Sequence, residues 1–397
     1  MVTGAWRGDF SSPSMRIAMV AACPFPWPRG TPIRIHRMAE ALGRRGHDVH
    51  VVTYHLGGQT PTPHMTVHRI QGPSWYRRTA PGPSFAKLAV LDPLLSYRLR
   101  QLLNARSFDV VHAHHYEGLL AALFARARCK PPVVFDSHTL LETELPHYGS
   151  SLGATFRRHA GRVLDRALPT RADHVIAVSD DMRLHYEGGG HLRQDGITVV
   201  SNGVEVDHFR TDLPESSSGN TLTFAGNLAP YQRIDLLLES FARVRLGNPA
   251  ARLNVLTADD FKPFIALCKR LDIHHRVEVR DVDYQRLPAE LNRATVLANP
   301  RVECSGVPQK LLNYMASGTP TVSFASSAKL LEHERSGLIV PDSDVSAFAN
   351  AVLRLMSDAG LRSRLGRHAQ EVVARDYSWD RVAAHVEQVY ARVTALP

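Results

Sequence analysis

Apolar residues in the first half of the chain repeat one order: a short apolar run, a break, and then apolar positions at helical spacing. The run that starts at Met15 ends in a loop rich in proline and glycine. The apolar residues of the next segment recur every three or four positions, at Ile35, Met38, Ala39 and Leu42. That spacing predicts a helix with one buried face. A second apolar run over 47–55 completes a strand–helix–strand unit of a parallel sheet.

The same order continues along the chain. Further apolar runs lie at 108–115, 131–139 and 172–179. Segments of helical pattern lie between them, at 117–128 and 152–168. Repeated units of this kind predict an α/β domain with a doubly wound parallel sheet over 15–205. Residues 1–14 carry no such pattern, and we expect them to form a disordered tail.

A polar stretch over 206–220 interrupts the pattern and ends in serine and glycine, as is typical of a linker. A new strand–loop–helix unit follows, with apolar positions at Ile234, Leu237, Leu238 and Phe241. It predicts a second Rossmann-like domain over 221–378. The amphipathic segment 379–397 is expected to form a helix that packs back toward the first domain. Two domains of this type predict a central cleft between them, where ligands bind.

Composition fits this organisation. The chain has 397 residues, 44% of them hydrophobic, which is enough for two globular domains. Its 4 cysteines stand far apart, so neither a disulfide framework nor a metal cage is predicted, and a cytoplasmic location is favoured. No apolar run approaches the roughly 20 residues of a membrane span. The first residues also lack the apolar core of a signal peptide.

The formal net charge of +9 has three explanations. Nucleic-acid binding is not expected, because no nucleic-acid module is recognisable and aromatic residues are sparse. A second explanation is binding to an anionic membrane surface or to a phosphate-rich substrate. The remaining explanation is a solvated surface rich in arginine.

Several segments occur in an order that resembles a known family. They include "FDVVHAHH", "PVVFDSHT", "VVSNGVEVDHF", "FAGNLAPYQRIDLLLESF" and "VPQKLLNYMASGTPTVSF". From Met15 to Val393 the chain resembles the family 4 glycosyltransferases of GT-B fold. The resemblance implies two Rossmann-like doubly wound domains that face a central cleft. It also implies transfer of a sugar from a nucleotide-diphosphate donor to a hydroxyl, with retention at the anomeric carbon and without a required metal or cofactor.

Two other functions remain open. One is a catalytically silent GT-B protein that binds glycan or supports a partner transferase. The other is a GT-B enzyme with different chemistry, such as a sugar-nucleotide epimerase. For the transferase, the resemblance implies a hydroxylated acceptor that is a glycan, a lipid-linked sugar or a small molecule.

His138 lies at the end of a predicted strand and matches the family's histidine that faces the sugar. Its imidazole is suited to hydrogen-bond a sugar hydroxyl or the acceptor, and its backbone carbonyl to stabilise positive charge at the anomeric carbon. The alternative is a structural histidine.

Other polar residues near the predicted strand ends are candidates for the acceptor side. Strand alternation puts His112 and His114 on one face of the strand and His115 on the other, so these three histidines are not expected to share one ion. No metal site is predicted. His114 and His115 are instead expected to line the acceptor side. Glu142 and Glu144 are expected either to contact a hydroxylated or aminated acceptor or to decorate a surface helix.

On the donor side, Gly30 and Thr31 stand where the family has a glycine-rich turn that lets backbone amides approach a diphosphate. The alternative is an ordinary strand-to-helix turn. A helix that follows Gly306 offers a second set of amides, because its first N–H groups have no partner within the helix.

The donor half departs from the family pattern. Gly226 and Asn227 stand where the family has Gly-Arg, and Gln232 and Arg233 where it has lysine before glycine. Each missing charged hydrogen bond to phosphate is worth about 1.5–3 kcal/mol. Arg233 is expected to supply part of the lost charge.

The paired glutamates of the family are also changed. Ser305 and Asn313 occupy their positions, and Glu303 lies two residues upstream of the first. Asparagine can still accept a hydrogen bond from a ribose hydroxyl, but without the strength of a carboxylate. Lys310, in the first turn of the predicted helix, is expected either to compensate for the lost phosphate-binding cations or to be solvated.

A basic segment in the first domain suggests a partner. Its arginines are Arg157, Arg158, Arg162 and Arg166, which lie beside the apolar Phe156, Val163 and Leu164. Such a helix favours peripheral contact with an anionic membrane at the inner face of the cell membrane. An exposed, solvated helix is the alternative.

Overall fold

The computed structural model describes residues 13–27, 30–58, 61–79, 82, 84–126, 131–148, 153–189, 192, 194–210, 220–304 and 306–395. The chain divides into two compact units: unit 1 comprises Met1–Val200 with Val382–Pro397, and unit 2 comprises Ser201–Arg381. Most of the expected N-terminal tail and the candidate Ser305 lie outside the described residues.

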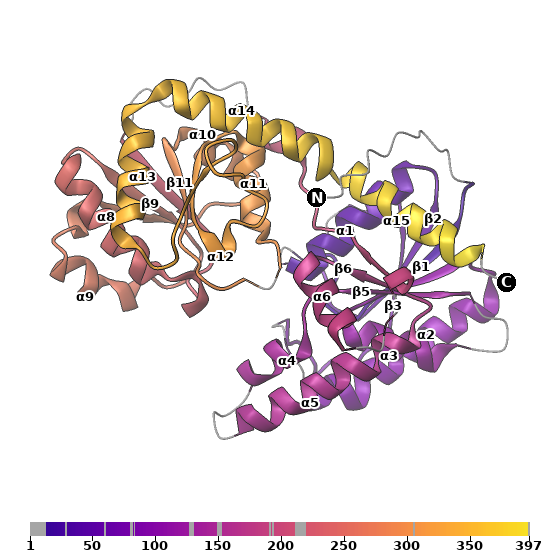
Figure 1. The fold of residues 1–397 in the computed structure, drawn as a ribbon. Coiled ribbons are helices and arrows are strands. Elements are labelled where there is room, and N and C mark those ends of the chain that lie inside the picture. The colour runs from indigo at the N-terminus through magenta and orange to yellow at the C-terminus, as the bar shows by residue number, and fades with distance from the viewer. Residues whose placement is uncertain are drawn as a thin grey trace. The chain divides into compact units, whose positions relative to one another are not determined.

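Unit 1 contains a seven-stranded parallel sheet in the order β3-β2-β1-β4-β5-β6-β7. Its strands are β1 (Arg16–Ala21), β2 (Asp48–Thr53), β3 (Thr66–Arg69), β4 (Val110–His114), β5 (Val133–Ser137), β6 (His174–Ala177) and β7 (Ile197–Val199). The strand order reverses at β1, which pairs with both β2 and β4. The central strands are almost fully buried because helices cover both faces of a doubly wound sheet (Figure 1).

The helical elements of unit 1 are α1 (Gly30–Arg44), η1 (Lys87–Leu91), α2 (Asp92–Ala105), α3 (His115–Ala125), α4 (Leu141–Glu144), η2 (Leu145–His147), α5 (Ala154–Ala167), η4 (Pro169–Arg171), α6 (Asp180–Gly188), η5 (Gln194–Gly196) and most of α15 (Trp379–Thr394). The predicted apolar face of α1 is fully buried. Helices α2, α3 and α6 share one hydrophobic cluster with the sheet. In α15, Glu387 is held by Arg45 and His47, with Nε and Nε2 at 2.6 and 2.9 Å from the carboxylate.

Unit 2 contains a six-stranded parallel sheet in the order β10-β9-β8-β11-β12-β13. Its strands are β8 (Thr221–Ala225), β9 (Arg252–Leu256), β10 (Val277–Arg280), β11 (Val296–Asn299), β12 (Thr321–Phe324) and β13 (Leu338–Val340). Its helical elements are α7 (Val206–Phe209), η6 (Pro230–Gln232), α8 (Ile234–Gly247), α9 (Lys262–Arg270), η7 (His274–Arg276), α10 (Leu287–Arg293), α11 (Gln309–Ser317), α12 (Ala325–Ala328), α13 (Val345–Ser357) and α14 (Ala359–Asp376). Both sheets therefore have the α/β, Rossmann-like architecture that the apolar pattern predicts.

Helix α11 is fixed at its carboxyl end by close packing. Gly318, at φ 75°, ends the helix in the left-handed region, which favours glycine. A Cβ added to Gly366 of α14 would lie 1.8 Å from the Gly318 carbonyl oxygen, so α14 can cross α11 this closely only with glycine there. The carboxyl end of α11 is thereby fixed against α14.

The polar stretch between the two expected domains is partly ordered. Its first residues form α7, and Phe209 is fully buried in the core of unit 2. Residues 211–219 lie outside the described part of the chain. Within that described part, no helix is both long and apolar enough to span a bilayer.

Candidate active site

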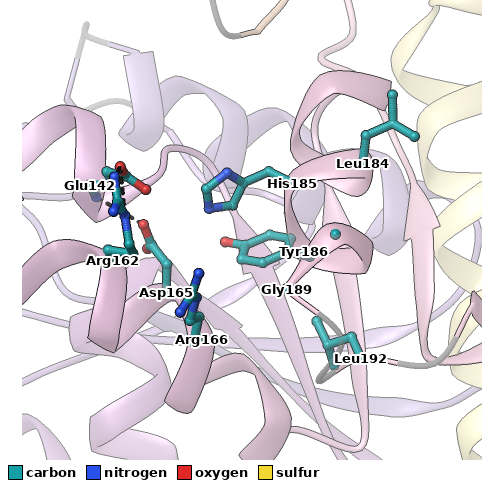
Figure 2. A pocket seen from close by; sticks show the side chains of 10 residues that line it. Glu142, Arg162, Asp165, Arg166, Leu184, His185, Tyr186, Gly189 and Leu192 are labelled. Atoms are coloured by element: carbon teal, nitrogen blue, oxygen red, sulfur yellow. Dashed lines mark hydrogen bonds and ion pairs between the residues drawn. The ribbon is translucent and has the colours of Figure 1, made fainter. Parts of the chain in front are cut away.

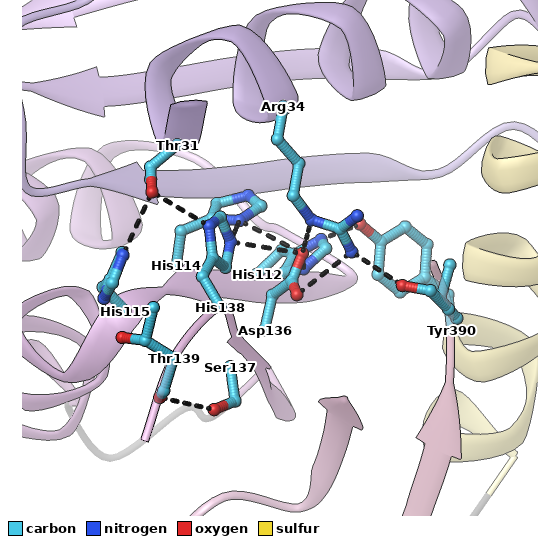
Figure 3. A network of polar contacts seen from close by, with 11 residues as sticks. Thr31, Arg34, His112, His114, His115, Asp136, Ser137, His138, Thr139 and Tyr390 are labelled. Atoms are coloured by element: carbon cyan, nitrogen blue, oxygen red, sulfur yellow. Dashed lines mark hydrogen bonds and ion pairs between the residues drawn. The ribbon is translucent and has the colours of Figure 1, made fainter. Parts of the chain in front are cut away.

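A polar network lies at the carboxyl edge of the unit 1 sheet (Figure 3). His138 follows β5 directly, His114 ends β4, and Thr31 lies in the first turn of α1. Parallel strands end at the same edge, so these elements bring their polar side chains together. His138 Nδ1 lies 3.2 Å from Thr31 Oγ1, and its Nε2 lies 3.2 Å from His114 Nδ1. The structure thus joins three of the candidate residues from the sequence.

Asp136 is the anchor of this network. Its carboxylate is fully buried in β5 and accepts hydrogen bonds from Arg34 Nε and Nη2 at 3.1 and 3.2 Å. Arg34 also donates to the Val200 carbonyl at 3.0 Å. Burial alone would raise the pKa of Asp136, but Arg34 and the neighbouring histidines hold it well below its usual range. Asp136 is therefore ionised and charge-balanced inside the unit.

Three imidazole nitrogens surround the same carboxylate oxygen. His114 Nδ1 lies 3.3 Å from Asp136 Oδ2, while the Nε2 atoms of His112 and His138 lie at 3.6 Å. The rings of His112 and His114 stack at 4.3 Å, as strand alternation predicts. His112 also bonds through Nδ1 to the Tyr390 hydroxyl at 2.6 Å. The carboxylate therefore orients the histidines of two strands at once.

Sequence reasoning did not place a carboxylate beside these histidines, whereas the structure puts Asp136 next to His112 and His114. One ligand atom each from His112, His114 and Asp136 lie within 4.8 Å of one another. However, the guanidinium of Arg34 already neutralises the carboxylate, and a cation bound there would lie beside a fixed positive charge. The arrangement is better suited to orient imidazoles than to hold a metal.

The central histidines are neutral at ordinary pH. Burial lowers the pKa of His138 to about 4, although Asp136 opposes the shift. Burial also lowers the pKa of His114 well below its usual value. A neutral imidazole has one donor and one acceptor nitrogen, and His138 uses both of them, on Thr31 and His114, without carrying charge.

His115 occupies a strained position beside this network. Its φ is 62°, in the left-handed region that residues with a side chain rarely adopt, at the first residue of α3. This conformation brings its Nε2 within 3.0 Å of Thr31 Oγ1. Thr31 thus contacts two candidate histidines at the start of α1.

The two glutamates of α4, Glu142 and Glu144, have different hydrogen-bond partners. Glu144 accepts hydrogen bonds from Thr139 and from the Tyr148 hydroxyl. Burial would raise the pKa of Glu144, but His115 and these hydrogen bonds more than offset it, so the pKa is lowered. Glu142 instead pairs with Arg162 of α5, whose Nε lies 3.0 Å from Oε1. Glu144 therefore lies near the histidine network and Glu142 beside a different pocket.

Of the candidate arginines of α5, Arg157 and Arg162 have partners within unit 1. Arg157 donates to the Leu145 carbonyl at 3.2 Å, and Arg162 pairs with Glu142. Arg158 and Arg166 are exposed. The apolar neighbours on the same helix are exposed as well: Phe156 at 76%, Val163 at 51% and Leu164 at 37%.

Unit 2 has a pocket of about 320 Å³ at the carboxyl ends of β8 and β9. Among its lining residues are the candidates Gly226, Asn227, Lys310 and Asn313. Asp281 and Val282, which follow β10, line the same pocket. Gly226 has φ 152°, in a region that favours glycine, where the chain turns away from β8. The structure therefore gathers residues far apart in the sequence around the first turn of α11.

Lys310 is held by a neutral partner. Its Nζ donates to Gln232 Oε1 at 2.6 Å and lies 4.5 Å from the ring centre of Phe224. Gln232 in turn donates to Asn227 Oδ1 at 3.2 Å. Burial of the ammonium, with a smaller contribution from Arg301, lowers the pKa of Lys310 to about 7. The two amides at the unusual positions thus hold the lysine at the pocket.

The other donor-side candidates have local partners. Arg233 pairs with Asp235, with Nη2 at 2.7 Å from Oδ2, so its charge is largely used at the start of α8. The Gly306 carbonyl accepts from Cys304 Sγ at 2.7 Å, and the Glu303 carbonyl accepts from Arg301. Gly30 begins α1, and a Cβ added there would meet open space.

Sequence reasoning missed several residues of these sites. Arg301 lies over the Tyr231 ring, with its Cζ 4.6 Å from the ring centre. Arg34 and Asp136 were also missed, although each is a charged residue within an otherwise apolar run, which is a usable signal. Tyr390 was not predictable because it comes from the far end of the chain.

Comparisons with known proteins agree with this architecture. Residues 28–208 match the model described as Glycosyltransferase Family 4, and residues 219–358 match the model described as Glycosyl transferases group 1. The fold and the family models together define a glycosyltransferase with a GT-B fold. The chain belongs to the family 4 glycosyltransferases, and the resemblance inferred from its sequence motifs is confirmed.

Relatives of known sequence and structure cover nearly the whole chain. An uncharacterized glycosyltransferase of Methanocaldococcus jannaschii is 26% identical over 95% of this chain and 98% of its own length. The phosphatidyl-myo-inositol mannosyltransferase of Mycobacterium leprae is 26% identical over 96% of this chain and 97% of its own length.

Solved structures share the fold at lower identity. Sucrose-phosphate synthase from Thermosynechococcus elongatus has a TM-score of 0.79 and 19% identity, with coverage of 96% of this chain and 100% of that one. Anabaena HepE in complex with UDP has a TM-score of 0.75 and 16% identity, with coverage of 95% and 100%.

Proposed function

We propose that this glycosyltransferase moves a sugar from a nucleotide-diphosphate donor to a hydroxyl of a glycan, lipid-linked or small-molecule acceptor, with retention at the anomeric carbon and in the cytoplasm. The observation that carries the proposal is the partly buried Lys310, which faces the unit 2 pocket from the first turn of α11 and whose Nζ contacts the Gln232 amide and the Phe224 ring. A helix N-terminus and an ammonium together are suited to a diphosphate. The UDP complex of HepE supports the same donor class, and the mannosyltransferase relatives support transfer of a sugar.

Unit 2 is assigned the donor. The nucleoside would lie in the pocket beside Asp281 and Val282, with Asn313 as a hydrogen-bond partner for the ribose. The diphosphate would lie toward Lys310 and the amides that follow Gly306. These groups would stabilise the negative charge that develops on the leaving diphosphate. No further cofactor is proposed, and the nucleotide sugar is a co-substrate.

Unit 1 is assigned the acceptor and the sugar contacts. The acceptor hydroxyl oxygen forms a bond to the anomeric carbon on the face from which the diphosphate oxygen departs, and the departing phosphate takes the hydroxyl proton. Neutral His138, oriented through Nε2 by Asp136, would exchange the contact of Nδ1 with Thr31 for a hydrogen bond to the sugar during this step. His114, His115 and Glu144 are proposed to shape the acceptor side, and the amides of Gly30 and Thr31 to approach the diphosphate.

A donor screen tests the proposal. Thermal unfolding should be measured with nucleoside diphosphates and their sugars, because a ligand of the folded state raises its stability. We expect the nucleoside diphosphate of one base to stabilise the protein. The corresponding sugar nucleotide should be consumed, and the product should keep the anomeric configuration of the donor. A silent protein would consume no donor. An epimerase would convert the donor sugar without any acceptor.

Membrane contact through α5 is a second proposal about partners. Exposed Phe156, Val163 and Leu164 beside exposed Arg158 combine apolar area with positive charge on one helix. We expect the protein to sediment with anionic liposomes at low salt and less with neutral liposomes. A Phe156→Ser variant should sediment less, and equal sedimentation with both liposomes would contradict the proposal.

A further inference from the structure

Unit 1 has a second pocket, separate from the histidine network. It has a volume of about 310 Å³ and lies among α4, α5 and α6 (Figure 2). Its polar lining consists of Glu142, Arg162, Asp165, Arg166, His185 and Tyr186. Of these, Glu142 was singled out from the sequence as an acceptor contact, and the two arginines were singled out for membrane contact. The volume is at the lower end for small-molecule sites and fits a single ring rather than an extended ligand.

The floor of this pocket is rigid and hydrogen-bonded. Asp165 is 2% exposed and accepts from the backbone N–H groups of Leu141 and Glu142 at 2.9 and 2.8 Å. Tyr116 also donates to Asp165, and its hydroxyl lies 2.9 Å from that of Tyr186. The floor therefore fixes the start of α4 against α5 and α6.

The same floor connects to the strand that carries His138. The Tyr186 hydroxyl lies 2.6 Å from Ser137 Oγ. Ser137 ends β5 and directly precedes His138. A ligand in the pocket would thus lie one short hydrogen-bonded chain away from the proposed sugar-contacting histidine.

The rim offers unused hydrogen-bonding groups. Within the part of the chain that the structure describes, the side chains of Arg166 and His185 make no hydrogen bond or ion pair. Arg162 uses Nε and Nη2 on Glu142, which leaves Nη1 available. Apolar Leu184 and Leu192 complete the lining. Donors, acceptors and apolar surface therefore face one small space.

The charge balance discriminates between ligand classes. The two arginines are matched by the two carboxylates of Glu142 and Asp165, so the lining has no large net charge before His185 is counted. A phosphate would meet the buried carboxylate of Asp165 at the floor, which is unfavourable. A neutral hydroxylated ring can use donors and acceptors together, since each hydroxyl both donates and accepts.

We propose that this pocket binds one neutral sugar ring, or a similar polyol, of the acceptor. The proposal rests on the proposed function, because only a transferase with a hydroxylated acceptor needs such a subsite. The Glu142 carboxylate then accepts a hydrogen bond from a ring hydroxyl, and the Arg162 guanidinium donates one. Arg166 and His185 contact the ring hydroxyls from the rim of the pocket.

The test is ligand-observed NMR, with saturation transfer to methyl glycosides of glucose, mannose and galactose. We expect transfer to at least one glycoside. Arg166→Ala and His185→Ala should each weaken its binding about tenfold, because each removes a hydrogen bond from a charged or polar group. Arg171→Ala, an exposed arginine outside the pocket, should bind as the parent does, and thermal unfolding verifies that each variant is folded.

Three outcomes would overturn the proposal: no transfer to any methyl glycoside, binding unchanged by both rim variants, or displacement of the glycoside by inorganic phosphate. Donor consumption, measured in the same preparations, separates this subsite from the proposed function. Consumption without glycoside binding would reject the subsite alone. Glycoside binding without donor consumption would reject the transferase and leave a sugar-binding pocket.

Discussion

Each unit holds a charged side chain at the carboxyl edge of its sheet, and the two charges are held in opposite ways. In unit 1 the Asp136 carboxylate is fully buried and neutralised by Arg34. In unit 2 no carboxylate of a described residue lies within ion-pair distance of Lys310 Nζ, which donates to the Gln232 amide. A charge that is neutralised internally orients its neighbours, whereas a charge held by a neutral amide remains available to an external anion.

This difference explains the unusual donor-side residues. Where the family carries an arginine and a lysine, Asn227 and Gln232 form a hydrogen-bonded pair that holds Lys310 from α11. In the proposed donor site, the positive charge is therefore supplied from the first turn of α11 rather than from the loop after β8. There it adds to the helix dipole, which also favours an anion.

The largest expected effect comes from the histidine network. His138→Ala should lower turnover by about 10²- to 10⁴-fold, the usual range for a positioned acid–base or hydrogen-bonding group in the transition state. Donor affinity, measured by calorimetry, should change little, because the donor is assigned to unit 2. His274→Ala, at an exposed histidine of η7, serves as the control. Unchanged turnover in His138→Ala would refute its role.

The buried ion pair should dominate the stability of unit 1. Arg34→Met leaves the Asp136 carboxylate buried without its partner, and we expect a loss of about 3–5 kcal/mol in the free energy of unfolding. Arg37→Met on the same helix breaks a pair with Glu40 that is still partly exposed to solvent, and it should cost less than Arg34→Met. Urea unfolding of both variants measures the contrast. Equal losses would show that Asp136 is not the anchor of the network.

The fold was predictable because apolar spacing is a local property. The strand–helix order of both sheets and the buried face of α1 follow from residues a few positions apart. The partners of Asp136 were not predictable, because they come from α1, β4 and the loop after β5, and Tyr390 comes from α15. The compensating role suggested for Lys310 was visible in the sequence, whereas its contact with Gln232 depends on how α11 packs.

Removal of the lysine charge should weaken the donor site specifically. Lys310→Met keeps the length of the side chain but loses a charged hydrogen bond to phosphate, so donor affinity should fall about 10- to 100-fold. The free energy of unfolding should not fall, because burying an ammonium without a carboxylate is unfavourable in the free protein. Lys262→Met, at an exposed lysine of α9, is the matched control. If donor affinity survives in Lys310→Met, the diphosphate is bound elsewhere.

The smallest and sharpest effect is a pH dependence of donor binding. The pKa of Lys310 is lowered to about 7 by burial, with Arg301 contributing in the same direction and Cys304 opposing. A bound diphosphate stabilises the ammonium and raises its pKa, so binding above pH 7 takes up one proton. Donor affinity should therefore be nearly flat below pH 7 and fall by up to about tenfold per pH unit above it.

Calorimetry with a nucleotide sugar measures this uptake directly, because its fully esterified diphosphate does not titrate near neutral pH. Titrations in two buffers of different protonation enthalpy should give the same proton count, close to one at pH 8 in the parent. The Lys310→Met variant should take up none. Proton uptake that persists in this variant would assign the pH dependence to another group. Lys310 would then not be the charge that replaces the loop cations of the family.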